Sequence, residues 1–171
     1  QTVRVKQYSR AAIALECATH ILGGGMTGRL MHTVRVERGL GTYGLYAVMQ
    51  YVSPKTDGIF CIQGTFSPTS IHEGLAATKE LLAGWHGGVH EDELARAKEH
   101  MVGSRVIAMD SVDHLHGMVL QYLMHQKSPR AAMQAYRETV ESLSLAEVNQ
   151  TLRELIDVDA MSEVVVGPTS I

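Results

Sequence analysis

The stretch Ile21–Ala47, ILGGGMTGRLMHTVRVERGLGTYGLYA, changes its apolar spacing twice, and the rest of the chain is arranged around it. An apolar helical run ends at Leu22 and meets three glycines, after which apolar residues recur at the spacing of a second, basic helix. Gly39 can end that helix, because glycine adopts the left-handed conformation of a helix C-terminus without steric cost. Aromatic and β-branched residues then predict a strand over Tyr43–Val52.

The sequence on either side of this stretch predicts the fold class. Alternating residues indicate a short strand over Thr2–Val5, and Ser9 suits the N-cap of the helix that precedes the glycines. A turn followed by a strand-like run over Ile59–Phe66 predicts an antiparallel hairpin. Helical spacing then continues until a last strand, expected over Glu163–Val166. This order predicts a single α+β domain, a two-layer sandwich in which helices cover a small, mostly antiparallel sheet.

Caps and glycines divide the helical part of the chain. Ser70-Ile-His-Glu73 and Ser144-Leu-Ala-Glu147 each place a glutamate three residues after a serine, the pattern of a capping box at a helix N-terminus. We expect Gly84, Gly87 and Gly88 to break the helix that begins at the first of these boxes.

The composition is that of an ordinary globular domain. The 171 residues are 45% hydrophobic and 19% charged, with a formal net charge of −3. This charge argues against nucleic acid or a membrane surface as the main partner, and no apolar run approaches the roughly 20 residues that cross a bilayer. Cys17 and Cys61 have no paired spacing, which favours free thiols and a reducing compartment. Because the first methionine is Met26, we expect an excerpt of a longer chain, with any targeting segment outside it.

The glycine cluster has a functional and a structural interpretation. Gly23-x-Gly25-x-x-Gly28 has the spacing of a dinucleotide-binding fingerprint, but that fingerprint follows a strand and this cluster follows a helix. The structural alternative is a tight turn between helices, in which side chains would collide. The residues favour the turn.

Nine histidines raise the question of a metal site. His86 and His90 are four residues apart, but two glycines between them interrupt the helix that would align them. His114 and His116, two residues apart, point to roughly opposite sides of a helix. We therefore expect surface histidines, and no metal or other cofactor in this domain.

A set of motifs extends along nearly the whole chain: Leu22-Gly-Gly-Gly25, Arg29-Leu30, Arg35-Val-Glu-Arg-Gly-Leu40, Tyr43, Gly58-Ile-Phe60, Glu91-Asp-Glu-Leu-Ala-Arg-Ala-Lys98 and Val164-Val-Val-Gly-Pro168. Together they resemble the second, non-catalytic domain of the pitrilysin/insulinase-type zinc metallopeptidases. That family includes the mitochondrial processing peptidase and the core subunits of the respiratory cytochrome complex. The resemblance implies the LuxS/metallopeptidase-like fold of the processing peptidases.

The resemblance also implies a division of labour. Family members bind zinc through a His-x-x-Glu-His motif and a distal glutamate, and this string does not occur in the chain. A zinc-bearing domain, in the same chain or in a partner subunit, is therefore expected to close a chamber against this domain. A peptide substrate would be bound there in extended form. The substrate-binding residues implied are Gly23, Gly24 and Gly25 of the glycine loop, together with Arg38.

The resemblance further implies an arginine and tyrosine pair that reaches across to the zinc site. Arg35 matches the family arginine, and Tyr43 matches the tyrosine if one inserted residue is absorbed before it; without the insertion, Thr42 takes the place. An arginine and a hydroxyl can donate hydrogen bonds to a peptide carbonyl or to charge developing on it. The residues alone are also consistent with Arg35 and Arg38 as solvated helix charges and Tyr43 as a strand aromatic.

Three functions follow as alternatives. The first is a non-catalytic substrate-binding domain of a zinc metalloendopeptidase, which is no hydrolase by itself. The second is a catalytically degenerate structural subunit of the same family, and the third is a stand-alone binding module. A homodimer is also open as a state of assembly.

Overall fold

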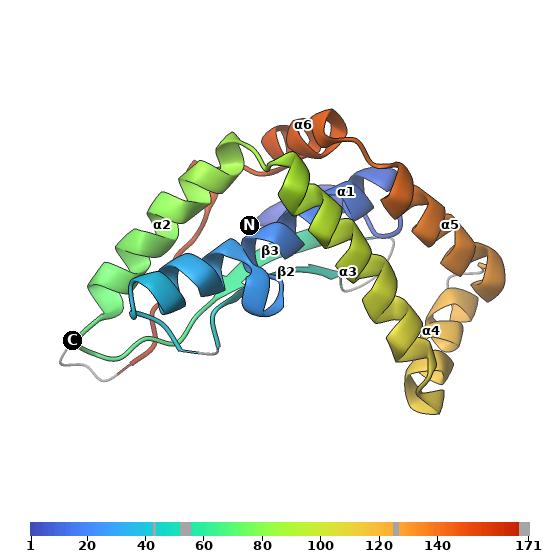
Figure 1. Cartoon of the computed structure of the whole chain (residues 1–171), viewed down its shortest axis with the longest axis horizontal. Helices are drawn as coiled ribbons and strands as arrows, with labels where there is room; N and C mark the ends of the chain where they lie inside the picture. Colours follow the sequence, from blue (N-terminus) through green and yellow to red (C-terminus); the bar gives the residue numbers. More distant parts are fainter. Residues whose placement is uncertain (43, 52–55, 125–126, 168–171) are drawn as a thin grey trace.

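The computed structural model describes residues 1–42, 44–51, 56–124 and 127–167, in which helices predominate around a small sheet (Figure 1). In chain order the elements are β1 (Thr2–Lys6), α1 (Arg10–Gly23), the short 3₁₀ helix η1 (Gly25–Thr27), the π-helix η2 (Leu30–Glu37), β2 (Tyr46–Tyr51), β3 (Asp57–Gln63), α2 (Ile71–Gly87), α3 (Glu91–Met109), α4 (Val112–Met124), α5 (Pro129–Ser142), α6 (Leu145–Leu155) and η3 (Val158–Ala160).

The sheet confirms the expected hairpin and fold class. Within the described residues it has three strands in the order β1-β3-β2, and both pairs are antiparallel. The strand limits differ from those that the sequence predicts. β2 begins at Tyr46, while Tyr43 and Val52 lie outside the described residues. β3 runs over Asp57–Gln63 and not to Phe66, whose ring packs where a side chain on Gly74 of α2 would lie.

Helix α1 is the centre of the core. Its side chains at Ala12, Leu15 and Leu22 are fully buried, because the helix lies between the sheet and the other helices. Phe60 of β3 stacks on Trp85 of α2 with their ring centroids 5.4 Å apart. The indole N–H of Trp85 donates to the Ala18 carbonyl oxygen over 2.8 Å, which satisfies the buried polar group.

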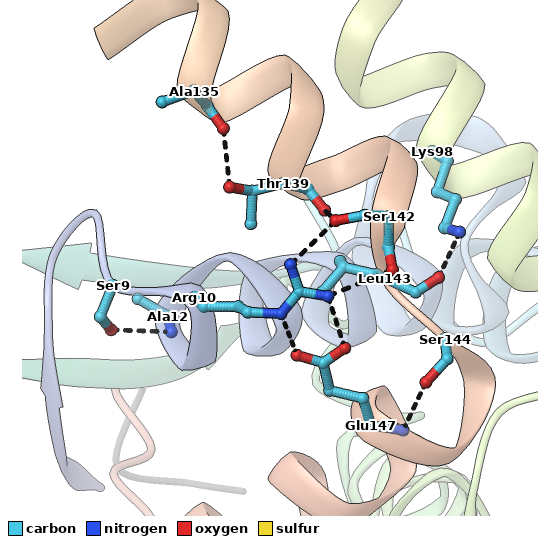
Figure 2. Close-up of polar contacts among 10 residues, drawn as sticks. All are labelled: Ser9, Arg10, Ala12, Lys98, Ala135, Thr139, Ser142, Leu143, Ser144 and Glu147. Carbon is cyan, nitrogen blue, oxygen red and sulfur yellow. Dashed lines mark hydrogen bonds and ion pairs between the residues drawn. The ribbon is translucent and has the colours of Figure 1, made fainter.

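Polar contacts connect the start of α1 to two later helices (Figure 2). The Ser9 hydroxyl accepts a hydrogen bond from the Ala12 N–H, which confirms the predicted N-cap. The Arg10 guanidinium forms a bidentate pair with Glu147 of α6 and also donates to Ser142 of α5. The predicted cap of α6 is present, because Ser144 accepts from the Glu147 N–H. The N-terminus of α1 is thereby joined to the C-terminal helices.

Of two other predictions about helix ends, one is wrong and one holds only in part. The Ser70 side chain makes no cap hydrogen bond; its hydroxyl lies within hydrogen-bond distance of Ser67 and of the Leu40 carbonyl oxygen. Gly84 does not break α2, because a single glycine inside a helix costs only about 1 kcal/mol and the helix continues to Gly87. The end predicted at Gly87 and Gly88 is confirmed: Gly88 is the C-cap, with φ of 145°, a conformation that favours glycine.

The segment predicted as a last strand, Glu163–Val166, is extended but pairs with no strand in the described part of the chain. It follows η3 and runs beside α2 (Figure 1), held there by an ion pair of 2.7 Å between Lys79 and Glu163. Val164 and Val166 are 84% and 92% exposed. Strand-forming composition thus did not produce a strand, because a strand also needs a pairing neighbour and the segment lies beside α2 without one.

Candidate functional site

The predicted basic helix is η2, a π-helix that carries Arg35. Its apolar residues Leu30, Met31 and Val34 are buried against the core, as their spacing predicts. Gly39 has φ of 67°, and its N–H donates to the Arg35 carbonyl oxygen, so the predicted glycine cap is confirmed.

The glycine loop between α1 and η2 begins at Gly23, which lies directly on the sheet. A Cβ on Gly23 would be 2.2 Å from the backbone nitrogen of Ala47 in β2, and one on Gly24 would be 2.0 Å from the His20 ring. Gly25 has φ of 62°, which side chains disfavour. The structure therefore fits the turn interpretation, and the helix that precedes the glycines does not provide the strand of a dinucleotide site. Contact with a peptide stays a prediction.

A partly buried ion pair holds the end of the loop. Arg29 donates to both carboxylate oxygens of Glu93 at the start of α3, over 2.7 and 2.6 Å, and to the Gly88 carbonyl oxygen over 3.1 Å. The two side chains are only 19% and 16% exposed. Burial acts to raise the pKa of Glu93, but hydrogen bonds from Arg29 and the His90 N–H outweigh it, so this pKa lies below its usual value. The loop is therefore fixed to α3 by a charge-assisted contact.

The two arginines later in η2 differ in their surroundings. Arg35 is half-buried, and one guanidinium nitrogen lies 3.8 Å from the sulfur of Met31 one turn earlier. Arg38, at the C-cap, is exposed and donates to Glu80 of α2 over 2.8 Å. Arg38 thus has an ion-pair partner within the domain, which fits the interpretation of a surface helix charge.

The hydroxyl expected beside Arg35 is described for only one of the two alternatives. The Thr42 hydroxyl donates to the Thr65 carbonyl oxygen over 3.2 Å, and its backbone N–H donates to the same oxygen. Tyr43 lies outside the described residues. Thr42 therefore joins the segment before β2 to the segment after β3. The choice between Thr42 and Tyr43 stays a prediction.

The histidines that the sequence raised as possible metal ligands lie in surroundings that hold no cluster of ligands in the described structure. His86 is half-buried, with Nε2 2.9 Å from the Ile156 carbonyl oxygen, so it is not the surface residue that the sequence predicts. His114 and His116 are exposed on α4. Across residues 1–42, 44–51, 56–124 and 127–167, no three His, Cys, Asp or Glu side chains converge to hold a metal ion.

A buried polar cluster escapes sequence reasoning. Arg105 of α3 donates to the Tyr122 hydroxyl over 2.8 Å, and its guanidinium carbon lies 3.4 Å from the centre of the Tyr136 ring. Burial raises the pKa of Glu16 in α1 to about 7, although the nearby Arg105 charge acts to lower it. The Tyr51 hydroxyl is buried and has no hydrogen-bond partner within the described residues. The signal in the sequence is Glu16, the one acidic residue of a predominantly apolar helix.

Comparisons with known proteins place this geometry in context. The sequence profile of the peptidase M16 inactive domain matches residues 2–101. The chain is similar to an uncharacterised zinc protease of Streptomyces coelicolor, 34% identical over 97 residues, and to one of Bacillus subtilis, 31% identical over 96 residues. Each match covers 55% of this chain but only 20% and 22% of the respective relative. The chain therefore matches about a fifth of the length of these relatives.

The fold has relatives among solved structures. The peptidase M16 inactive domain from Pseudomonas fluorescens superposes with a TM-score of 0.74 at 23% identity, over 92% of this chain and 37% of that chain. The structural likeness thus continues through the helices that follow residue 101, where the profile match ends.

Proposed function

Because the chain belongs to the family of peptidase M16 inactive domains, we propose that it is the non-catalytic, substrate-binding domain of a zinc metalloendopeptidase. In this role it closes a peptide chamber against a zinc-bearing domain. The observation that carries the proposal is that the family match spans the glycine loop, η2 and the hairpin. These elements lie together, since Gly23 contacts Ala47 and a Cβ on Gly41 would lie 3.9 Å from that of Arg35.

The names of the relatives imply zinc, and no three candidate ligands converge within the described residues to hold it. In this proposal the metal belongs to the partner domain. The contribution of this chain is then hydrogen-bond donation. Arg35 carries a permanent charge and several N–H donors, which suit the carbonyl oxygen of a peptide and the negative charge that develops on it during hydrolysis.

The hydroxyl of Tyr43 completes the proposed pair. In this proposal Thr42 keeps its bond to the Thr65 carbonyl oxygen and so is not free to reach the substrate. The glycine loop and Arg38 contact the peptide backbone beside the reacting bond. An extended peptide bound there gains main-chain hydrogen bonds, which give affinity without strong dependence on its side chains.

Turnover in the complete protease, with the zinc-bearing domain restored, tests the assignment. Arg35→Ala should lower kcat by about 10²–10³, roughly 3–4 kcal/mol, and change KM less, because the donor acts chiefly in the transition state. Tyr43→Phe should act in the same direction and non-additively with Arg35→Ala, since both groups hold one oxygen. Thr42→Ala should be nearly silent.

Arg153→Ala is the matched control, because Arg153 is an exposed arginine on α6. It should leave kcat and KM unchanged. Unchanged turnover in both Arg35→Ala and Tyr43→Phe, with the fold intact, would overturn the assisting role and favour a structural subunit. A strong loss of turnover in Thr42→Ala would instead assign the hydroxyl of the pair to Thr42, as in the alignment without an inserted residue.

A further inference from the structure

Two histidine rings from different helices stack beside the glycine loop. His20, in the last turn of α1, and His100 of α3 have ring centroids 4.4 Å apart and planes inclined by 18°. His20 is half-buried and His100 is exposed. Both line a cavity of about 60 Å³, which Thr27 of the loop and Glu93 also line. The stacked pair therefore joins α1 to α3 where the loop begins.

The loop contacts the pair through Gly24. The Gly24 N–H donates to the His20 carbonyl oxygen over 2.7 Å. A Cβ at this position would lie 2.0 Å from His20 Nδ1, so the loop backbone packs against the ring itself. Any movement of the His20 ring toward the loop must therefore displace Gly24. This contact couples the state of the ring to the conformation of the loop.

The charged and titratable groups around the pair offer little compensation for added positive charge. They are Glu16 and Cys17 on α1, Glu93 and Arg96 on α3, and Arg29 just before η2, while η1 contributes none. Glu93 is bound to Arg29, Arg96 is bound to Asp92, and Glu16 interacts with Arg105. Two imidazolium rings 4.4 Å apart would repel each other, and the nearby carboxylates already interact with arginines.

Protonation is linked to this packing. Burial, and then the neighbouring His100, lower the pKa of His20 from its ordinary value. A histidine whose pKa is lowered by the fold binds its proton more readily when the contact opens. The stacked arrangement is therefore most stable above the ordinary histidine pKa of about 6.5 and loses stability as the pH falls below it.

We propose that the stacked His20 and His100 rings are an acid-sensitive latch that holds the glycine loop, residues 23–28, in place. Near neutral pH the His20 ring is uncharged, the pair is closed and Gly24 packs against the ring. Acidification charges the half-buried His20 ring, which draws it toward water and away from His100 and frees Gly24. The latch deepens the proposed function and rests on it for its purpose, since it regulates the loop assigned to peptide contact. The latch itself is a property of the chain alone.

Hydrogen exchange of the loop amides, followed by NMR on the 171-residue chain, tests the latch without peptide or protease. After correction for the intrinsic pH dependence of exchange, protection of the Gly24 amide, which is bonded to the His20 carbonyl oxygen, should fall by up to about tenfold one pH unit below 6.5. His20→Phe keeps a planar ring that cannot charge, so protection should become independent of pH, whereas His100→Phe leaves the burial of His20 in place and should only weaken the pH response. Gly24→Ala forces the His20 ring to move, so protection should already be low at pH 7.5.

His114→Phe is the matched control, because this histidine is exposed on α4 and should leave the wild-type pH response intact. Equal protection of the wild-type loop at pH 7.5 and 5.5 would overturn the latch, whatever the variants do. The same pH response in His20→Phe would overturn it as well. Failure of the proposed function appears differently, as normal turnover in Arg35→Ala, and does not affect this measurement.

Discussion

Glu16 shows how one residue can make stability depend on pH. It lies on a helix whose buried residues are mostly apolar, with the charge of Arg105 nearby. Burial favours the neutral carboxyl and raises its pKa to about 7. The folded state therefore keeps a proton that the unfolded chain releases at lower pH. The folded state therefore loses stability as the pH rises from about 4.5, the ordinary pKa of a glutamate, to about 7.

Glu16→Gln, which imitates the protonated carboxyl, should therefore stabilise the domain at high pH. Between the ordinary pKa of about 4.5 and the folded value near 7, wild-type stability should fall by about 2–3 kcal/mol relative to the variant. Urea denaturation of both proteins from pH 4.5 to pH 8 measures the difference. Glu99→Gln, at an exposed position of α3, is the control and should show no such trend. A constant difference between Glu16→Gln and wild type across the range would contradict the argument.

Arg29→Ala should destabilise the domain strongly, because it leaves the partly buried Glu93 carboxylate without its cationic partner. We expect a loss of about 2–3 kcal/mol in the free energy of unfolding. Replacing both partners, as Arg29→Met with Glu93→Leu, should recover much of it, since no charge is then left without a partner. Arg96→Ala, which breaks an exposed pair with Asp92, should have little effect in the same denaturation assay. A double variant as unstable as the sum of the single losses would refute this interpretation.

At the scale of the element, helix ends show why a cap pattern needs its tertiary setting. Ser9 and Ser70 both precede helices, but only Ser9 accepts a hydrogen bond from the first turn. Ser9→Ala should therefore cost about 1 kcal/mol, and Ser70→Ala distinctly less. Chemical denaturation of the two variants measures the contrast. Equal losses in both would mean that the Ser70 contacts with Ser67 and Leu40 stabilise as much as a true cap.

Elements with strong local signals are the ones that the sequence predicts well. The helix before Leu22, the cap at Gly39 and the antiparallel hairpin all depend on spacing or on glycine, which act within a few residues. The segment Glu163–Val166 shows the limit, because its composition favours a strand but the structure gives it no partner edge. Strand formation depends on a neighbour, which local sequence does not encode.

The candidate site likewise contains features that local sequence predicts and contacts that it does not. The burial of Val34, the collisions around Gly23 and the position of Arg35 on a basic helix follow from spacing and from the family resemblance. The Arg29–Glu93 pair and the stacked histidines do not, because their members are 64 and 80 positions apart and meet only after α3 packs on α1. Contacts of this kind need the three-dimensional arrangement, since no local pattern requires either partner.

For the whole molecule, the distribution of apolar surface is uneven. The second half of α3 and helix α4 project from the body of the domain (Figure 1). They carry half of the large exposed hydrophobic side chains identified in the described structure: Val106, Ile107, Val112, Leu115, Leu120, Leu123 and Met124. In α4 only Tyr122 is buried, although the helix is predominantly apolar. Among the helices described, none is long and apolar enough to span a membrane. Exposed apolar side chains gathered at one end of the molecule favour association with another protein surface.

We therefore expect the isolated domain to self-associate through this end. Sedimentation velocity should show an average mass that rises with concentration, because burying apolar side chains in a second copy removes them from water. Ile107→Glu with Leu123→Glu should keep the domain monomeric, since both side chains are exposed and like charges would face each other across the contact. Val164→Glu with Val166→Glu places the same charge at an equally exposed apolar site beside α2 and should leave association unchanged. A wild-type domain that stays monomeric at the highest concentration would contradict the prediction that these exposed side chains form an association surface.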